Sequence, residues 1–245
     1  MRSKTSALGV KIAIMGAMPE EIAPILEKLG EYKTTEYAGN KYYEATYKGT
    51  ELVIAYSKIG KVFSTLTATT MIEHFSAQKL LFSGVAGAIS PTLKVGDLIV
   101  ATKLSQHDLD ITAFGHPFGY VPEGAVFVEA DTDMIAMSKD VARDMGKTVQ
   151  EGIIATGDQF VANEERKNWI GTEFKADALE MEGASVAVVC NALNVPFFIL
   201  RAISDAADMD ASFSFDEFLE TSAVESAEFV MKMVDKIVIP LSNAK

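Results

Sequence analysis

Cysteine is almost missing from the sequence: its 245 residues include one, Cys190, which lies in an apolar stretch. A single cysteine cannot form an internal disulfide bond, so the sequence favours a reducing compartment, and we expect a cytoplasmic protein. Histidine is also scarce, with three residues and no close grouping with the cysteine. We therefore expect no metal site. We also expect no nucleophilic role for Cys190, because a thiol in apolar surroundings is usually inert.

Basic residues are the second shortage, with 22 Lys and Arg against 34 Asp and Glu and a formal net charge of −12. Binding to nucleic acid through its phosphates, or to an anionic membrane surface, needs clustered Lys and Arg. We expect neither partner, and a small neutral or cationic ligand fits the charge better. No apolar run reaches the length of a membrane span, and the opening Met1–Ser6 lacks the following apolar region of a signal peptide.

Hydrophobic residues make up 49% of the sequence, which is enough for a sizeable core. Short apolar runs alternate with amphipathic stretches, which predicts an α/β fold with three layers, α/β/α, around a central mixed, twisted sheet. No repeat, low-complexity tract or linker divides the chain. We therefore expect one domain over residues 1–245, in which residues 1–9 form a disordered or tag-like leader.

The expected elements follow from hydrophobic periodicity and from turn residues. Strands are predicted at Val10–Met15, on both sides of the Lys48–Gly49 turn within Lys41–Tyr56, at Lys79–Ser83, at Asp97–Thr102, from Gly152 and at Val195–Ile203. Helices are predicted from Pro19, at Phe63–Phe75, at Asp131–Met145, at Asn163–Ile170 with Asn163 as its cap, from Gly183 and at Phe213–Lys236.

Carboxylates gather between residues 177 and 182, directly before an apolar helical stretch. One interpretation is that they complement the positive end of the helix dipole. The strand that follows, Val195–Ile203, suggests another, because it ends on the polar pair Ser204 and Asp205. Ligands of open α/β sheets bind at the carboxyl ends of strands. On this second interpretation, one β-α-β unit places Glu182 and Asp205 at a binding site.

The residues after the first predicted strand leave the same choice open. Pro19 suits the first turn of a helix, and Glu20 and Glu21 suit its positive end, but one of these carboxylates could instead point into the cleft beyond the strand. The glycine-rich segment Gly84–Ala88 is predicted to be a turn at which the backbone approaches a ligand closely. Its G-x-x-G spacing does not match a dinucleotide fingerprint, so we expect no cofactor of that kind.

The segment Gln106–Pro122 is long, aromatic and rich in Gly and Pro. Segments of this kind often form lids or binding surfaces. Its apolar residues would be poorly covered in a single copy of the chain, which favours contact with a partner subunit. The alternative is a loop that folds onto its own core.

Several separated motifs occur in the order of one family. They are Gly16–Glu21, Ser83–Gly87, Thr156–Val161 and Glu180–Ala184, followed by Arg201–Asp205 and Phe213–Phe218. Together they resemble the 5′-methylthioadenosine/S-adenosylhomocysteine nucleosidases of the nucleoside phosphorylase/hydrolase superfamily, over residues 11–236. The resemblance implies a nucleoside phosphorylase-like fold, a homodimer and no cofactor. It also implies that water cleaves the N-glycosidic bond of adenine thionucleosides, which yields adenine plus S-methyl-5-thioribose or S-ribosylhomocysteine.

The resemblance further implies a role for individual residues. Asp205 would be the general acid, oriented by Ser204, and Glu21 would be the carboxylate that activates water. Further contacts would come from Ala86, Gly87, Met181 and Glu182 at the ribose, from Phe160 and Val161 at adenine, from Met18, Ile59 and Phe215 at the 5′ substituent, and from Phe114, His116 and Pro122 in the pocket of the neighbouring subunit.

These roles agree with the chemistry of the reaction. Adenine leaves readily only after a ring nitrogen is protonated, which requires a carboxylic acid with a raised pKa. The ribose then develops oxocarbenium character, and a carboxylate on its other face can position water. Glu182 can accept hydrogen bonds from two ribose hydroxyls.

The alternatives are a phosphorylase and a nucleoside-binding sensor that has lost turnover. The carboxylates of Met18–Glu21 stand where phosphorylases of this superfamily bind phosphate, which favours water over phosphate as the nucleophile. The stretches Ile111–Pro117 and Ser57–Val62 resemble the branch that also cleaves 6-amino-6-deoxyfutalosine in menaquinone synthesis. Val85 and His116 depart from the serine and tyrosine that many relatives carry at those positions.

Overall fold

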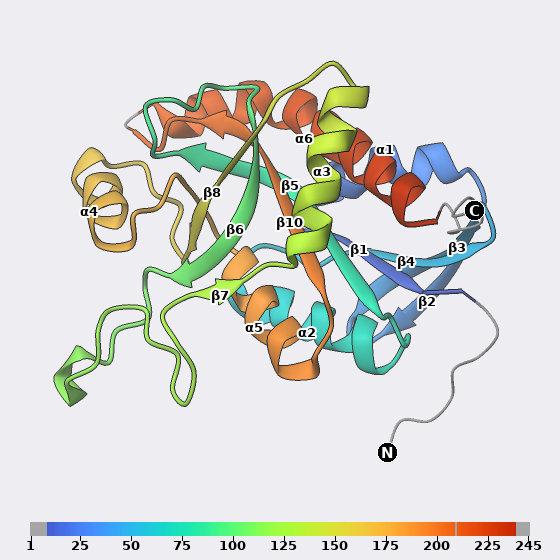
Figure 1. Ribbon diagram of the computed structural model, residues 1–245, viewed down its shortest axis with the longest axis horizontal. Helices are drawn as coiled ribbons and strands as arrows, with labels where there is room; N and C mark the ends of the chain where they lie inside the picture. The colour runs from blue at the N-terminus through green and yellow to red at the C-terminus, as the bar shows by residue number, and fades with distance from the viewer. Residues whose placement is uncertain (1–8, 209, 239–245) are drawn as a thin grey trace.

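The computed structural model describes residues 9–208 and 210–238. The expected leader at residues 1–9 lies outside them apart from Gly9, which is exposed. The described residues form a ten-stranded mixed sheet with helices on both sides (Figure 1). This arrangement confirms the predicted α/β class and its helix–sheet–helix layering. Within the same residues, no helix is both long enough and apolar enough to cross a membrane.

The strands are β1 (Ile12–Gly16), β2 (Lys33–Tyr37), β3 (Asn40–Tyr47), β4 (Thr50–Tyr56), β5 (Lys79–Ala88), β6 (Leu98–Gln106), β7 (Val128–Glu129), β8 (Val149–Thr156), β9 (Ala178–Glu180) and β10 (Phe197–Asp205). The helices are α1 (Pro19–Leu29), α2 (Lys61–Glu73), α3 (Thr132–Asp144), α4 (Glu164–Phe174), α5 (Gly183–Leu193) and α6 (Ala211–Val238), with a 3-10 turn η1 (Thr112–Phe114). Every helix and strand predicted from the sequence is present.

The sheet closes on itself along part of its width. Strand β10 pairs in parallel with β5 and antiparallel with β6, and β5 also pairs antiparallel with β9. Because β6, β8 and β9 are neighbours, these five strands form a closed circuit, and β1, β4, β3 and β2 extend outward from β5. The sequence did not predict this closure. It brings the ends of β8, β9 and β10 close to the second half of β5.

Two groups of helices cover the sheet (Figure 1). Helices α1 and α3 each pack against α6, and α6 lies along β5 and β10. On the other side, α2 packs against α5, β1 and β4. The core between them consists of fully buried aliphatic and aromatic side chains such as Ile14, Phe82 and Phe198. These contacts fix where the strand ends meet.

The predicted turn at Gly84–Ala88 is wrong, because this segment is the buried second half of β5. Its small residues allow other strands to pair along both of its edges, so that Gly87 lies opposite Leu179 of β9 and Asp205 of β10. Three strands were not predicted: β2, β9 and the two-residue β7. Strand β2 is polar and mostly exposed, and β9 comprises three residues of the acidic run, so neither has the alternation that reveals a strand.

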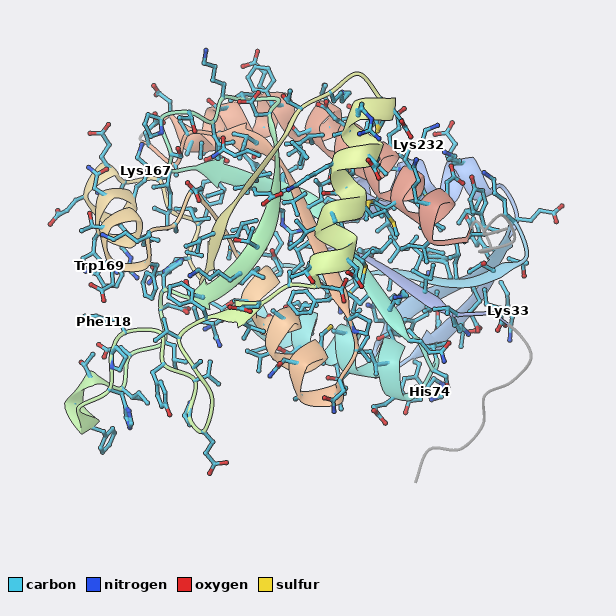
Figure 2. The ribbon with its side chains drawn as sticks, viewed as in Figure 1. Lys33, His74, Phe118, Lys167, Trp169 and Lys232 are labelled. Atoms are coloured by element: carbon cyan, nitrogen blue, oxygen red, sulfur yellow. The ribbon has the colours of Figure 1, made fainter. Side chains whose placement is uncertain are left out.

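Part of the segment after β6 folds onto its own core, as one of the two alternatives predicted, and contact of its tip with a partner subunit stays a prediction. Phe118 packs edge-on against Trp169 of α4, with ring centroids 5.1 Å apart, and the backbone N–H of Gly119 donates to the carbonyl of Leu109 over 2.7 Å (Figure 2). The tip of the segment projects from the body of the molecule (Figure 1). Phe114, at this tip, is 81% exposed.

Helix α4 begins with the cap predicted from the sequence, since the side chain of Asn163 accepts a hydrogen bond from the backbone N–H of Arg166 over 2.9 Å. We expect Asn163→Ala to lower the free energy of unfolding by about 1 kcal/mol, because that N–H loses its partner at the end of the helix. Urea-induced unfolding measures the loss. Asn163→Asp retains an acceptor and should remain near the parent stability, and equal destabilisation of both variants would contradict this role of the cap.

Candidate active site

A cavity opens where the ends of β1, β8, β9 and β10 meet the second half of β5. It encloses about 540 Å³ of empty space, including its mouth to solvent. All the predicted site residues except Phe114, His116 and Pro122 line it: Met18, Glu21, Ile59, Ala86, Gly87, Phe160, Val161, Met181, Glu182, Ser204, Asp205 and Phe215. Ala17, Val85, Gln159, Leu179 and Glu180 complete the wall.

Helix α1 directs Glu21 into the cavity. Its carboxylate is 2% exposed and accepts hydrogen bonds from the backbone N–H groups of Ala17, of Met18 over 3.0 Å and of Val85 over 3.3 Å. Glu20, by contrast, is exposed on the helix surface. The pKa of Glu21 is raised by burial, although Arg201 and the three N–H groups oppose the rise. Glu21 therefore points into the cleft beyond β1, which was one of the two interpretations of the carboxylates at the start of α1.

Strand β10 ends in the second buried acid of the cavity, Asp205. One carboxyl oxygen accepts from the hydroxyl of Ser204 over 2.9 Å, and the other accepts from the backbone N–H of Ala207 over 2.8 Å. Burial raises the pKa of Asp205, and the charge of Asp208 adds to the rise, whereas the two hydrogen bonds lower it. The group therefore keeps its proton to a higher pH than an ordinary aspartic acid does, and it lies in contact with the cavity.

Glu182 stands at the N-terminus of α5, where it precedes the first helical residue, Gly183. Its carboxylate accepts a hydrogen bond from the backbone N–H of Gly60 over 2.9 Å. Burial raises the pKa of Glu182, and the negative charges of Glu180 and Glu21 raise it further. A neutral ligand with hydroxyl donors would relieve this crowding, because the hydroxyls stabilise a carboxylate without bringing another charge.

One buried cation balances these carboxylates. Arg201 is 1% exposed in the middle of β10, and its guanidinium donates to Glu180 over 2.8 and 3.3 Å. Neither residue of this pair was predicted to have a role. An arginine inside an otherwise apolar strand was the available signal, because a buried charge requires a partner.

Small residues make room for the acids. An alanine at Gly87 would bring its Cβ within 2.7 Å of a carboxyl oxygen of Asp205, and one at Gly84 within 3.1 Å of Glu21. Neither glycine has a positive φ, so what these positions require is space and not an unusual backbone conformation. The close approach seen here is that of protein carboxyl groups to a strand; the predicted approach of this backbone to a ligand stays a prediction.

Aromatic and aliphatic side chains form the mouth of the cavity. Phe160, beyond the end of β8, is 48% exposed and contacts Phe215 edge-on, with ring centroids 5.5 Å apart. Ile59 is also exposed at this mouth. A half-exposed aromatic ring at the opening of a cavity offers a flat apolar surface for a planar ligand.

Phe114, His116 and Pro122 lie outside the cavity, on the projecting segment between β6 and β7. The ring of His116 stacks on that of Tyr120, with centroids 4.5 Å apart. Among the described residues, no group of three or more His, Cys, Asp or Glu side chains could hold a metal ion. Cys190 is a buried free thiol, and burial raises its pKa to about 12.

Comparisons with known proteins identify the family. The model of the phosphorylase superfamily matches residues 11–237. The chain is 58% identical to the aminodeoxyfutalosine nucleosidase of Campylobacter jejuni over 93% of this chain and all of that protein. It is 38% identical to the 5′-methylthioadenosine/S-adenosylhomocysteine nucleosidase of Anoxybacillus flavithermus over 93% and 99% of the two chains.

Solved structures show the same relationship. The native futalosine hydrolase of Helicobacter pylori superimposes with a TM-score of 0.93 at 52% identity, over 94% of this chain and all of that one. Since the family model and these relatives each span nearly the whole chain, the protein belongs to the phosphorylase superfamily, within the family of the 5′-methylthioadenosine/S-adenosylhomocysteine and aminodeoxyfutalosine nucleosidases.

Proposed function

We propose that the protein hydrolyses the N-glycosidic bond of adenine nucleosides with a modified 5′ position. The substrates are 5′-methylthioadenosine, S-adenosylhomocysteine and 6-amino-6-deoxyfutalosine, and the first two yield adenine with S-methyl-5-thioribose or S-ribosylhomocysteine. The observation that carries the proposal is the presence of two buried carboxyl groups with raised pKa, Glu21 and Asp205, in one cavity. The names of the relatives described above support the same substrates.

In this proposal Asp205 protonates a ring nitrogen of adenine as the bond to ribose breaks. The raised pKa leaves more of this acid protonated near neutral pH. After proton transfer, the hydrogen bonds from Ser204 and from the backbone of Ala207 stabilise the carboxylate that forms. Phe160 stacks on the purine, and the backbone of Val161 contacts its edge.

Glu21 acts on the other reactant, water. A carboxylate with a raised pKa is a stronger base than an ordinary glutamate, so it can take a proton from water as the nucleophile attacks. Its negative charge also stabilises the oxocarbenium character of the ribose. Glu182 accepts hydrogen bonds from the ribose hydroxyls, with Ala86, Gly87 and Met181 on the same side. Met18, Ile59 and Phe215 surround the 5′ substituent.

Charge favours water over phosphate as the nucleophile. A phosphate ion at the attacking position would meet the carboxylates of Glu21 and Glu182, and the guanidinium of Arg201 already donates to Glu180 and to the carbonyls of Phe82 and Leu200. Phosphorolysis needs cationic donors that face the anion. The relatives named as nucleosidases and hydrolases point to the same choice.

The proposal includes a homodimer in which Phe114, His116 and Pro122 complete the cavity of the neighbouring subunit. Its support is an exposed apolar surface near the mouth, formed by Ile59, Val62, Phe63 and Leu66, together with the projecting tip at Phe114. We also infer that the chain folds as one domain, because a single sheet connects its strands. A cytoplasmic location is part of the proposal, supported by the free thiol of Cys190.

The central test is the release of adenine from 5′-methylthioadenosine, measured with and without phosphate. We expect free methylthioribose at a rate that does not depend on phosphate, and adenine release from 6-amino-6-deoxyfutalosine in the same buffer. Acceleration by phosphate with formation of a sugar 1-phosphate would assign phosphorolysis instead. No turnover of any of the three nucleosides would favour a binding protein.

The acid is tested by Asp205→Asn, which conserves size but cannot donate a carboxylic proton. We expect kcat to fall by about 10²–10⁴-fold, with the affinity for adenine, measured by calorimetry, largely retained. Asp208→Asn is the matched control, because Asp208 influences Asp205 only through its charge. Comparable turnover in Asp205→Asn and the parent protein would remove Asp205 from this role.

The subunit contact is tested by Phe114→Ala. We expect a dimer by light scattering in the parent protein and a higher KM for 5′-methylthioadenosine in the variant, because the pocket of the 5′ substituent loses an apolar wall. Val224→Ala removes an exposed apolar side chain of α6 and should leave KM unchanged. A monomeric parent protein, or an unaltered KM in Phe114→Ala, would contradict the contact.

A further inference from the structure

Glu180 lines the cavity, yet no role has been assigned to it so far. Its side chain, at the end of β9, accepts from two backbone N–H groups at the start of α5: Glu182 over 3.3 Å and Gly183 over 2.8 and 3.0 Å. It also accepts from the hydroxyl of Thr156 and from two nitrogens of Arg201. Both carboxyl oxygens are therefore engaged with the protein, which leaves Glu180 poorly placed to bind a substrate.

Arg201 is held close to the groups that we assign to catalysis. Besides its contacts with Glu180, one terminal nitrogen donates to the carbonyls of Phe82 and Leu200 over 3.2 and 3.0 Å. A Cβ atom at Gly84 would lie 3.2 Å from that nitrogen and 3.1 Å from a carboxyl oxygen of Glu21. The guanidinium and the carboxylate of Glu21 thus approach the same small stretch of β5 backbone.

An arginine in this place has competing partners. Its positive charge lowers the pKa of both Glu21 and Glu182, which shows that each carboxylate lies within its electrostatic reach. A direct ion pair with either of them would occupy oxygens that the reaction needs for water and for the ribose hydroxyls. The bond to Glu180 prevents this, because it engages Nε and one terminal nitrogen while the backbone carbonyls engage the other.

Thr156 connects the same arrangement to the adenine side of the cavity. Its hydroxyl donates to Glu180 and accepts from the backbone N–H of Ala184 over 2.8 Å, so it joins the end of β8 to the first turn of α5. Phe160 and Val161 follow a few residues later on the same strand connection. One fully buried network thereby links the segment at adenine, the helix start at ribose and the cation near Glu21.

We propose that Glu180 is a positioning residue, which restrains Arg201 and the start of α5 so that Glu21 and Glu182 stay free for water and ribose. This inference rests on the proposed hydrolysis, because the two freed carboxylates matter only if they act on a nucleoside. It assigns to Glu180 no contact with the substrate. Thr156 supports Glu180 in the same role.

The charges around Glu182 give the inference a specific signature. Glu180 and Glu21 raise the pKa of Glu182, while Arg201 and the N–H of Gly60 lower it. His107 of the segment after β6 also lies within electrostatic reach of Glu180, but burial and Arg166 lower its pKa to about 4, so it is neutral near pH 7. Loss of the Glu180 charge would leave Arg201 unopposed and lower the pKa of Glu182.

The sign of the pH effect follows from the state that each group needs. Glu182 and Glu21 act as carboxylates, so activity is lost as pH falls through their pKa. This loss is the acid limb of the pH profile, and a lower pKa moves it to lower pH. Asp205 acts as an acid and sets the basic limb. Its pKa responds to burial, Ala207, Ser204 and Asp208, so the basic limb should stay in place.

The experiment compares the pH dependence of kcat/KM for 5′-methylthioadenosine in the parent protein and in Glu180→Gln. We expect kcat/KM of the variant to fall about tenfold or more at neutral pH, because Arg201, no longer paired with Glu180, would pair with Glu21 or Glu182 and occupy oxygens that the reaction needs. The acid limb should move down by about one pH unit, and the basic limb should not move. An acid limb at the parent position would overturn the inference.

Three further variants separate charge from packing. Glu180→Asp keeps the charge, so its acid limb should stay at the parent position although kcat falls; a shift equal to that of Glu180→Gln would overturn the inference. Thr156→Val should lower kcat without moving the acid limb. If Glu180→Gln does not fold, this variant is the test, because full activity of Thr156→Val would contradict the positioning role of Glu180 and Thr156. Glu151→Gln removes a β8 carboxylate that pairs with Lys139 away from the cavity, and its profile should match the parent.

The proposed function and this inference fail in different ways. Absence of adenine release from the parent protein would reject the hydrolysis itself. Normal hydrolysis by the parent, with a Glu180→Gln profile that superimposes on it, would reject only the role of Glu180.

Discussion

The buried ion pair between Arg201 and Glu180 is the interaction on which the rest of the site depends. Four carboxyl groups lie within or beside the cavity, at Glu21, Glu180, Glu182 and Asp205, and each of them is at most 6% exposed. A buried charge is costly unless it is paired and hydrogen-bonded. One guanidinium, tied to Glu180 and surrounded by backbone carbonyls, makes this concentration of acids compatible with a folded protein.

The fold makes that arrangement possible through the closure of the sheet. Because β10 pairs with both β5 and β6, the strand that carries Arg201 and Asp205 lies next to the strand that carries Gly84 and Gly87. The absence of side chains at these glycines leaves the space that the carboxyl groups occupy. The acids of the cavity therefore depend on the small residues of β5, because their carboxyl oxygens lie close to the buried backbone of this strand.

Most helices and strands, and most residues that line the cavity, could be predicted from the sequence for two reasons. Long periodic segments such as α3 carry their own signal, and the motifs around Glu21, Phe160, Glu182 and Asp205 occur in the order of a family. What depends on distant pairing could not be predicted. Glycines directly after an apolar run predict a turn at Gly84–Ala88, and only the pairing of β9 and β10 along this segment explains why the strand continues. Nor does a short acidic strand such as β9 have a pattern of its own.

The two acids that we propose for catalysis, Glu21 and Asp205, have different electrostatic surroundings. Burial raises the pKa of both Glu21 and Asp205. At Glu21 the positive charge of Arg201 opposes the rise, which favours the carboxylate that a water-activating base must be. At Asp205 the opposing groups are the neutral hydroxyl of Ser204 and the N–H of Ala207, and the charge of Asp208 adds to the rise. The charge of the arginine that pairs with Glu180 thus acts on Glu21 and not on Asp205, which supports the different roles that we propose for these two acids.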